Sequence, residues 1–172
     1  MSFEFASYIP IDFHPQSRVW IYQSSRLFTS NEAQDITAVL DNFVATWLSH
    51  GSQVKGFASL LFGNFILIMA DETTATVGGC STDSSVRVIK QIEEKCMVDL
   101  FNRQNLAFII NDQIQLLSLA KLNDGFENGL LTDNTSYFNN LVATKAQLLN
   151  EWIIPIKKSW LTTKIKKAIF ST

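Results

Sequence analysis

The run of six apolar residues from Phe65 to Ala70 constrains the fold more than any other feature of the sequence. A strand with one face in water alternates apolar and polar residues, whereas this run is apolar at every position. It therefore predicts a strand in the middle of a sheet, covered on both faces. The run Val54–Phe62 before it is also rich in strand-forming residues, and Gly63 and Asn64 suit a tight turn with positive φ. We expect the two runs to form a hairpin.

A capping box predicts where the helix before this hairpin begins. Thr29 and Glu32 stand three residues apart, so each side chain can accept a hydrogen bond from the backbone N–H group of the other. Apolar residues then recur at helical spacing as far as Leu48, and Gly51 is a typical C-terminal stop. The segment Arg18–Gln23, before the helix, alternates in the manner of a strand.

The second half of the chain adds further helices and strands. We expect, in chain order, a helix from about Asp83 or Ser84 and two strands, Leu106–Ile110 and Ile114–Leu119, joined by a turn around Asn111 and Asp112. A loop at Lys121–Asn134 and a helix from about Thr135 follow. The whole order is β-α-β-β-α-β, followed by an extra strand and a helix. This order predicts an α+β fold, with an antiparallel sheet and helices packed on one face. It resembles the ferredoxin-like split βαβ plan.

Length and composition predict a single domain over residues 1–172, with an N-terminal arm at 1–17 and a basic tail at 153–172. Apolar residues make up 47% of the chain and charged residues 17%, which suits one sizeable core. Two cysteines are too few for a disulfide framework. The first residues show no basic region followed by an apolar run, and no apolar run approaches the ~20 residues of a membrane helix. We therefore expect a cytoplasmic protein with reduced thiols.

The charge is distributed unevenly along the chain. The net charge is −2, but five of the 14 basic residues follow Trp152, where there is no acidic residue. A short basic tail most simply serves solubility. It could instead contact an acidic surface, and Trp160 with nearby apolar residues would suit a surface-binding helix. We do not expect nucleic acid as the partner.

The segment Gly78–Ser85 is where the sequence most favours chemistry. A glycine-rich turn at a helix start exposes backbone N–H groups, which would stabilise the thiolate of Cys80 and lower its pKa. Ser81 and backbone amides could then steady an oxyanion, with Asp71 and Asp83 nearby. In the simpler interpretation, which we favour, the glycines make the turn, Asp83 or Ser84 caps the helix, and Cys80 is a small semi-buried hydrophobe.

Four other side chains are candidate binding residues. Lys145 lies in the apolar stripe of the last predicted helix and could act as a base or an amine nucleophile, although such lysines usually reach solvent or pair with a carboxylate. Arg18 and Arg26 could bind an anion, but surface pairing is the simpler expectation. Trp160 belongs to the basic tail. No nucleotide-binding, zinc-binding or hydrolase motif is present, so we expect no metal and no cofactor.

Three segments, Arg18–Arg26, Gly79–Val86 and Asp99–Arg103, carry a resemblance to a known family. The chain resembles, over roughly residues 15–150, small uncharacterised bacterial proteins often labelled "ABC transporter ATPase". The resemblance implies a cytoplasmic bacterial origin and brings no catalytic residues with it. The label itself does not suit this sequence, because an ABC ATPase needs a phosphate-binding loop with a lysine, and none is present. We therefore do not expect ATP as a ligand.

Two hypotheses about function follow from these observations. The favoured one is a non-catalytic binding or interaction domain, which binds an unknown protein partner or associates with itself. The alternative is a thiol-dependent enzyme or redox sensor that uses Cys80. The sequence identifies neither a substrate nor a partner.

Overall fold

The computed structural model describes residues 3–73 and 77–165, apart from the side chains of Cys80 and Ser81. The chain forms two compact units. The larger unit consists of Phe3–Phe101 and Asn140–Leu149, and the smaller one of Asn102–Asn139 and the segment from Asn150 onward. The single domain expected from the sequence stays a prediction. Both units combine helices with antiparallel strands, which confirms the predicted α+β class.

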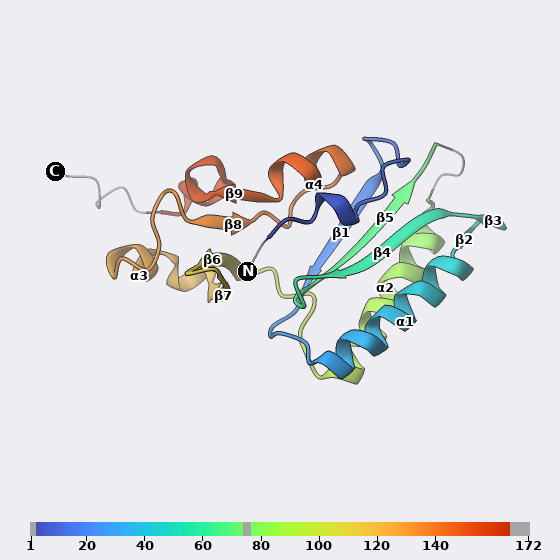
Figure 1. Ribbon diagram of the computed structural model, residues 1–172, viewed down its shortest axis with the longest axis horizontal. Helices are drawn as coiled ribbons and strands as arrows, with labels where there is room; N and C mark the ends of the chain where they lie inside the picture. The colour runs from blue at the N-terminus through green and yellow to red at the C-terminus, as the bar shows by residue number, and fades with distance from the viewer. Residues whose placement is uncertain (1–2, 74–76, 166–172) are drawn as a thin grey trace. The chain divides into compact units, whose positions relative to one another are not determined.

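The larger unit holds most of the elements that the sequence predicts. Its elements are η1 (Ala6–Tyr8), β1 (Arg18–Gln23), α1 (Ser30–Thr46), β2 (Leu48–Ser49), β3 (Ser52–Gln53), β4 (Lys55–Leu61), β5 (Phe65–Asp71), α2 (Gly79–Cys96) and the start of α4 (Lys145–Glu151). Helices α1 and α2 lie side by side on one face of the β1-β5-β4 sheet (Figure 1). The N-terminal arm and α4 lie on the opposite face (Figure 1).

The first three main strands follow the ferredoxin-like plan, and the fourth does not. β5 lies between β1 and β4 and is antiparallel to both, which is the split βαβ arrangement. The plan then requires β6 to pair with the free edge of β1. Instead, β6 joins a separate sheet, and Ala143 and Thr144 lie beside Arg18 and Val19 at that edge.

The strand at Phe65–Asp71 is buried at all seven positions, as the sequence predicts. Ile66, Ile68 and Ala70 face the helices and belong to their core. Odd-numbered side chains of β5 point to the other face, toward the arm. The turn before β5 is one residue longer than expected, because β4 ends at Leu61 and both Phe62 and Gly63 have positive φ.

Helix boundaries depart from the sequence prediction in two places. The capping box at Thr29 forms as predicted, but α1 ends at Thr46. Gly51 lies in the turn between β2 and β3 and does not end α1. Helix α2 begins at Gly79, with Gly78 as the N-cap, so neither Asp83 nor Ser84 caps it.

The smaller unit differs most from prediction. Its elements are β6 (Asn105–Ile110), β7 (Gln113–Ser118), η2 (Leu119–Lys121), α3 (Leu122–Glu127), β8 (Ser136–Phe138), β9 (Ile153–Pro155), η3 (Ile156–Lys158), η4 (Trp160–Thr163) and the end of α4. The β6–β7 hairpin is confirmed, with positive φ at Asn111 and Asp112. The helix predicted from Thr135 is wrong, because β8 pairs with β6 and β9 and α4 begins only at Lys145.

The described part of the predicted basic tail is folded. Ile156 and Leu161 are completely buried in the core of the smaller unit, and Ile165 is largely buried there. These side chains cannot form the apolar face of a surface-binding helix, so that part of the tail prediction is wrong. The residues of the tail after Ile165 lie outside the described residues.

Candidate functional site

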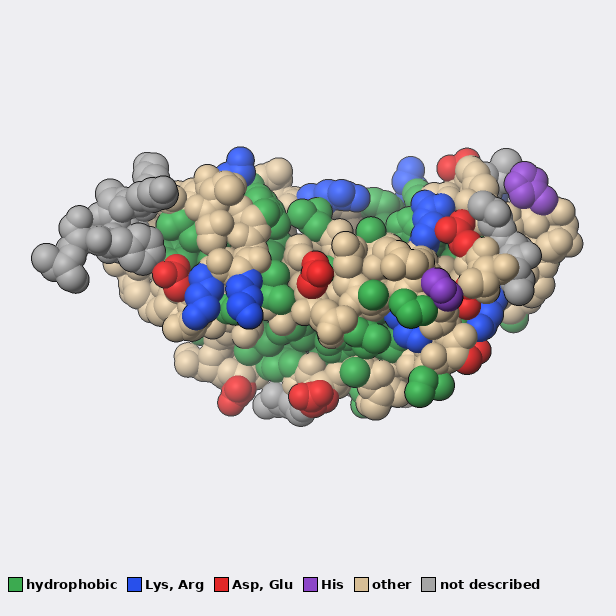
Figure 2. All heavy atoms as spheres, turned by 90° about the horizontal axis from the view of Figure 1, so that it is seen from above, with side chains coloured by type: hydrophobic (Ala, Val, Ile, Leu, Met, Phe, Trp, Pro, Cys, Tyr) green, Lys and Arg blue, Asp and Glu red, His purple; other side chains and the backbone are tan. Residues whose placement is uncertain are grey.

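Charged side chains of both signs and the two histidines gather at the end of the larger unit where β5 ends (Figure 2). Asp71, one of the predicted catalytic residues, is buried at this end. Its carboxylate accepts hydrogen bonds from the backbone N–H of His14, from the N–H and Oγ1 of Thr73, and from Nζ of Lys55. Burial acts to raise the pKa of Asp71, but these donors outweigh it and the pKa lies well below the ordinary value. Asp71 is therefore a structural anion and is poorly suited to act as a base.

The ammonium groups of two lysines bind the N-terminal arm. Lys55 Nζ lies 3.0 Å from the Asp12 carboxylate and 4.8 Å from the centroid of the Phe13 ring. Lys145, only 7% exposed, donates to the backbone carbonyls of Pro10, Ile11 and Phe13 at 2.8, 3.1 and 2.7 Å. All three N–H groups of the Lys145 ammonium are thereby used. Lys145 therefore neither reaches solvent nor pairs with a carboxylate, and in this state it is not available to a ligand.

The two predicted arginines also have partners within the protein. Arg26 makes two hydrogen bonds with the Glu32 carboxylate, at 2.8 and 2.9 Å, and the surface pairing expected for it is present. This guanidinium, with the backbone N–H of Thr29, lowers the pKa of Glu32 to about 2. Arg18 lies 4.8 Å from the centroid of the Trp20 ring and 3.7 Å from the Glu72 carboxylate.

The start of α2 places Cys80 and Ser81 in the first helical turn, although their side chains lie outside the described residues. The side chain of His50 lies beside this turn. A Cβ added to Gly78 would lie 2.9 Å from His50 Nε2, so the imidazole rests against the N-cap backbone. Asp83 is exposed on the second turn. Asp71 points to the opposite face of the sheet from α2, and its carboxylate is bound by residues of that face.

Trp160 lies in η4, partly buried against the core of the smaller unit. Its indole N–H donates to the hydroxyl of Tyr137 at 3.2 Å. The indole thus packs within the protein and does not stand out from a tail.

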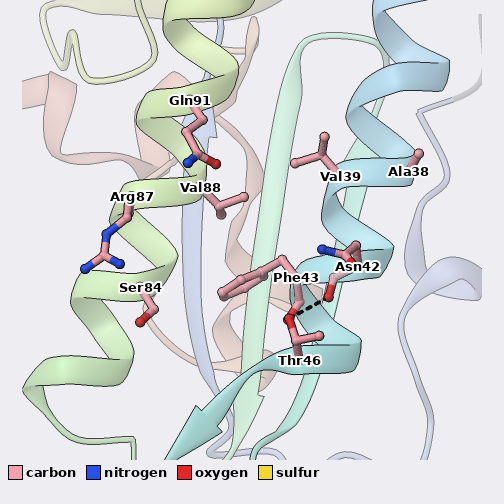
Figure 3. A pocket seen from close by; sticks show the side chains of 9 residues that line it. All are labelled: Ala38, Val39, Asn42, Phe43, Thr46, Ser84, Arg87, Val88 and Gln91. Atoms are coloured by element: carbon pink, nitrogen blue, oxygen red, sulfur yellow. Dashed lines mark hydrogen bonds between the residues drawn. The ribbon is translucent and has the colours of Figure 1, made fainter.

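A groove between α1 and α2, on the side of the helices away from the sheet, is a site that the sequence did not single out. It has a volume of about 470 Å³. Val39, Phe43 and Val88 form its apolar floor, and the close-up shows these side chains pointing between the two helices (Figure 3). Its rim is polar and consists of Asn42, Thr46, Ser84, Arg87 and Gln91.

Among the described residues that line this groove, Arg87 is the only charged one. Among the described residues, no carboxylate lies within ion-pair distance of it, and the side-chain amides of Asn42 and Gln91 likewise have no protein hydrogen-bond partner. Farther along the two helices, Lys95 and Asp35 form an ion pair at 2.7 Å. The groove therefore offers an apolar floor together with one cation and two amides that are free to bind.

Nothing in the sequence pattern could have marked these residues. Asn42, Arg87 and Gln91 occupy the solvent side of amphipathic helices, where polar residues are ordinary. Only the antiparallel packing of α1 on α2, which depends on contacts distant in sequence, brings them to one groove.

Within the described ranges, no cluster of three or more His, Cys, Asp or Glu side chains is arranged to hold a metal ion. The helices of residues 3–73 and 77–165 are too short or too polar to cross a membrane. Comparison of the chain with family models, with curated proteins and with solved structures gave no significant match in any of the three.

Proposed function

We propose that the protein is a non-catalytic cytoplasmic binding domain and that the groove between α1 and α2 is its binding site. The observation that carries this proposal is the combination of an apolar floor with a cation, Arg87, that has no acidic partner among the described residues. A guanidinium without a partner in the protein can form charge-assisted, bidentate hydrogen bonds with a bound anion. Of the candidate catalytic groups, Asp71 is already engaged by His14, Lys55 and Thr73.

The groove suits a small amphipathic anion, whose apolar body would cover Val39, Phe43 and Val88. Its acidic group would lie against Arg87, and the amides of Asn42 and Gln91 would supply further hydrogen bonds. The volume of about 470 Å³ falls in the range of roughly 300–1,000 Å³ that small-molecule sites occupy.

Titration with 1-anilinonaphthalene-8-sulfonate, an aromatic sulfonate whose fluorescence rises in apolar surroundings, tests this proposal. The Arg87→Gln variant should bind it about five- to tenfold more weakly, which corresponds to about 1–1.4 kcal/mol. Added salt should weaken binding by the wild type more than by the variant. Lys90→Gln is the matched control, because it removes the same charge from an exposed position on the same helix. Equal affinities for the wild type and Arg87→Gln would contradict the proposal.

A second candidate function rests on His50. This imidazole lies against Gly78, two residues before Cys80, and Cys80 is in the first turn of α2. A helix N-terminus and a neighbouring histidine both favour a thiolate, so a thiol-dependent enzyme or redox sensor is the alternative proposal.

Labelling of Cys80 with iodoacetamide as a function of pH tests this alternative. The Cys96→Ala variant is the suitable background, although the Cys96 thiol is buried and burial raises its pKa. We expect a labelling pKa below the ordinary value of about 8.5, and a rise toward that value in His50→Ala. An ordinary pKa in both proteins would rule out the thiol mechanism.

A further inference from the structure

Strand β4 is an outer strand of the sheet in the larger unit, and its second edge has no neighbouring strand among the described residues. In an antiparallel pair, alternate residues turn their N–H and C=O groups away from the partner strand. Every second residue of Lys55–Leu61 therefore presents its backbone groups at this edge. The other outer strand, β1, differs, because the Val19 N–H donates to the Ala143 carbonyl and Arg18 is bridged to Thr144.

Exposed edge strands are usually protected by proline, bulges or charged side chains, because they can pair with another chain. β4 is seven residues long and contains no proline. Its register with β5 runs from Lys55 to Leu61 without a bulge. The only charge is that of Lys55, at the first position, and its ammonium is held by Asp12 and Asp71. The edge is thus long, regular and apolar.

We propose that β4 is an interface for a second copy of this chain, whose β4 adds antiparallel to it about a twofold axis at Ala58. The two three-stranded sheets would then form one sheet of six strands, with α1 and α2 of both copies on the same face. This interface is independent of the groove between α1 and α2.

The sequence of β4 is compatible with this self-pairing. With Ala58 opposite Ala58 of the second copy, Lys55 lies opposite Leu61, so no like charges face each other. Gly56 lies opposite Leu60, so the large side chain of Leu60 faces a residue that has no side chain. Each pair joins positions of the same face, as an antiparallel ladder requires. An unrelated acidic or basic peptide would gain no such match, because this edge has no charge that is free of a partner.

Disulfide trapping tests the proposal. In the proposed register, the Cβ atoms of residue 58 in the two copies lie roughly 4.5–5.5 Å apart, close enough to be bridged, whereas those of residue 59 are displaced along the strands. The Ala58→Cys variant in a Cys80→Ser background should form a covalent dimer under mild oxidation, and the Ser59→Cys variant is the matched control. We expect at least about tenfold more dimer from Ala58→Cys, because two cysteines more than ~7 Å apart at Cα cannot join. Equal trapping of both variants, or none, would overturn the proposal.

Light scattering during size exclusion tests it without any cysteine. The mass of the wild type should rise from 19.4 kDa toward twice that value as its concentration increases. Ala58→Asp and Ala58→Lys should each remain monomeric, since like charges would then face each other, and their mixture should recover the dimer. Recovery in the mixture also shows that each variant is folded. A wild type that stays monomeric at all concentrations, or a dimer that both single variants keep, would refute the interface.

Discussion

The clearest quantitative prediction concerns Lys145→Met, which removes the ammonium that binds the arm and keeps most of the aliphatic chain. Three hydrogen bonds from a charged donor are lost, at about 1.5–3 kcal/mol each, so a rigid structure would lose roughly 4.5–9 kcal/mol. The variant no longer has to remove a cation from water on folding, and this offsets several kcal/mol of the loss. Balancing the two effects, we expect the free energy of unfolding to fall by about 2–4 kcal/mol.

Urea unfolding followed by tryptophan fluorescence measures this loss directly. Lys90→Met is the matched control, because Lys90 is exposed on α2, and its change should stay within about 0.5 kcal/mol. The carbonyls of Pro10, Ile11 and Phe13 should also become accessible, so the arm should be cleaved faster by proteases in Lys145→Met than in the control. A loss below about 1 kcal/mol would show that these bonds do not stabilise the folded state, because it would not exceed an average single substitution.

Three further predictions concern stability. The folded-state pKa of Asp71 is lowered, so the stability that its carboxylate contributes is present above the unfolded-state pKa of about 3.9 and is lost as the pH falls below that value. Urea midpoints between about pH 6 and 2 should therefore fall less steeply in Asp71→Asn than in the wild type. Gly56→Ala should lower the free energy of unfolding by about 1–3 kcal/mol, because the new Cβ would lie 2.7 Å from the Trp47 ring. Gly79→Ala has open space around it and should raise the free energy of unfolding by up to about 1 kcal/mol. Thermal melts that rank the two variants the other way would contradict this. Thr29→Ala should cost about 1 kcal/mol through loss of the capping box, and an unchanged urea midpoint would refute that.

The elements that sequence predicted well are those whose causes are local. The capping box at Thr29 and Glu32 needs only residues three apart, and the Asn111-Asp112 turn needs only two residues that tolerate positive φ. The continuous apolar run of β5 indicates by itself that both faces of the strand are buried. Each of these features can be read from a window of a few residues.

The failures come from contacts that are distant in sequence. The apolar spacing from Thr135 onward imitates a helix, but Tyr137 pairs with Phe108 on one side and with Ile154 on the other, and this pairing outweighs local preference. The position of His50 beside Gly78 depends on the β2–β3 turn, which no sequence pattern predicted. The burial of Leu161 could not be predicted locally, because its core cluster includes Leu106 and Phe108, which lie far earlier in the chain.

The binding of the arm by Lys145 sets an order on folding during synthesis. Pro10, Ile11 and Phe13 leave the ribosome early, yet the ammonium that holds them is made 132–135 residues later. At roughly 5–20 residues per second, the interval is roughly 7–27 s. A nascent chain that ends before residue 145 lacks the ammonium that binds these three carbonyls, so until then the arm can be held only by its earlier partners, such as Lys55 and Asp71.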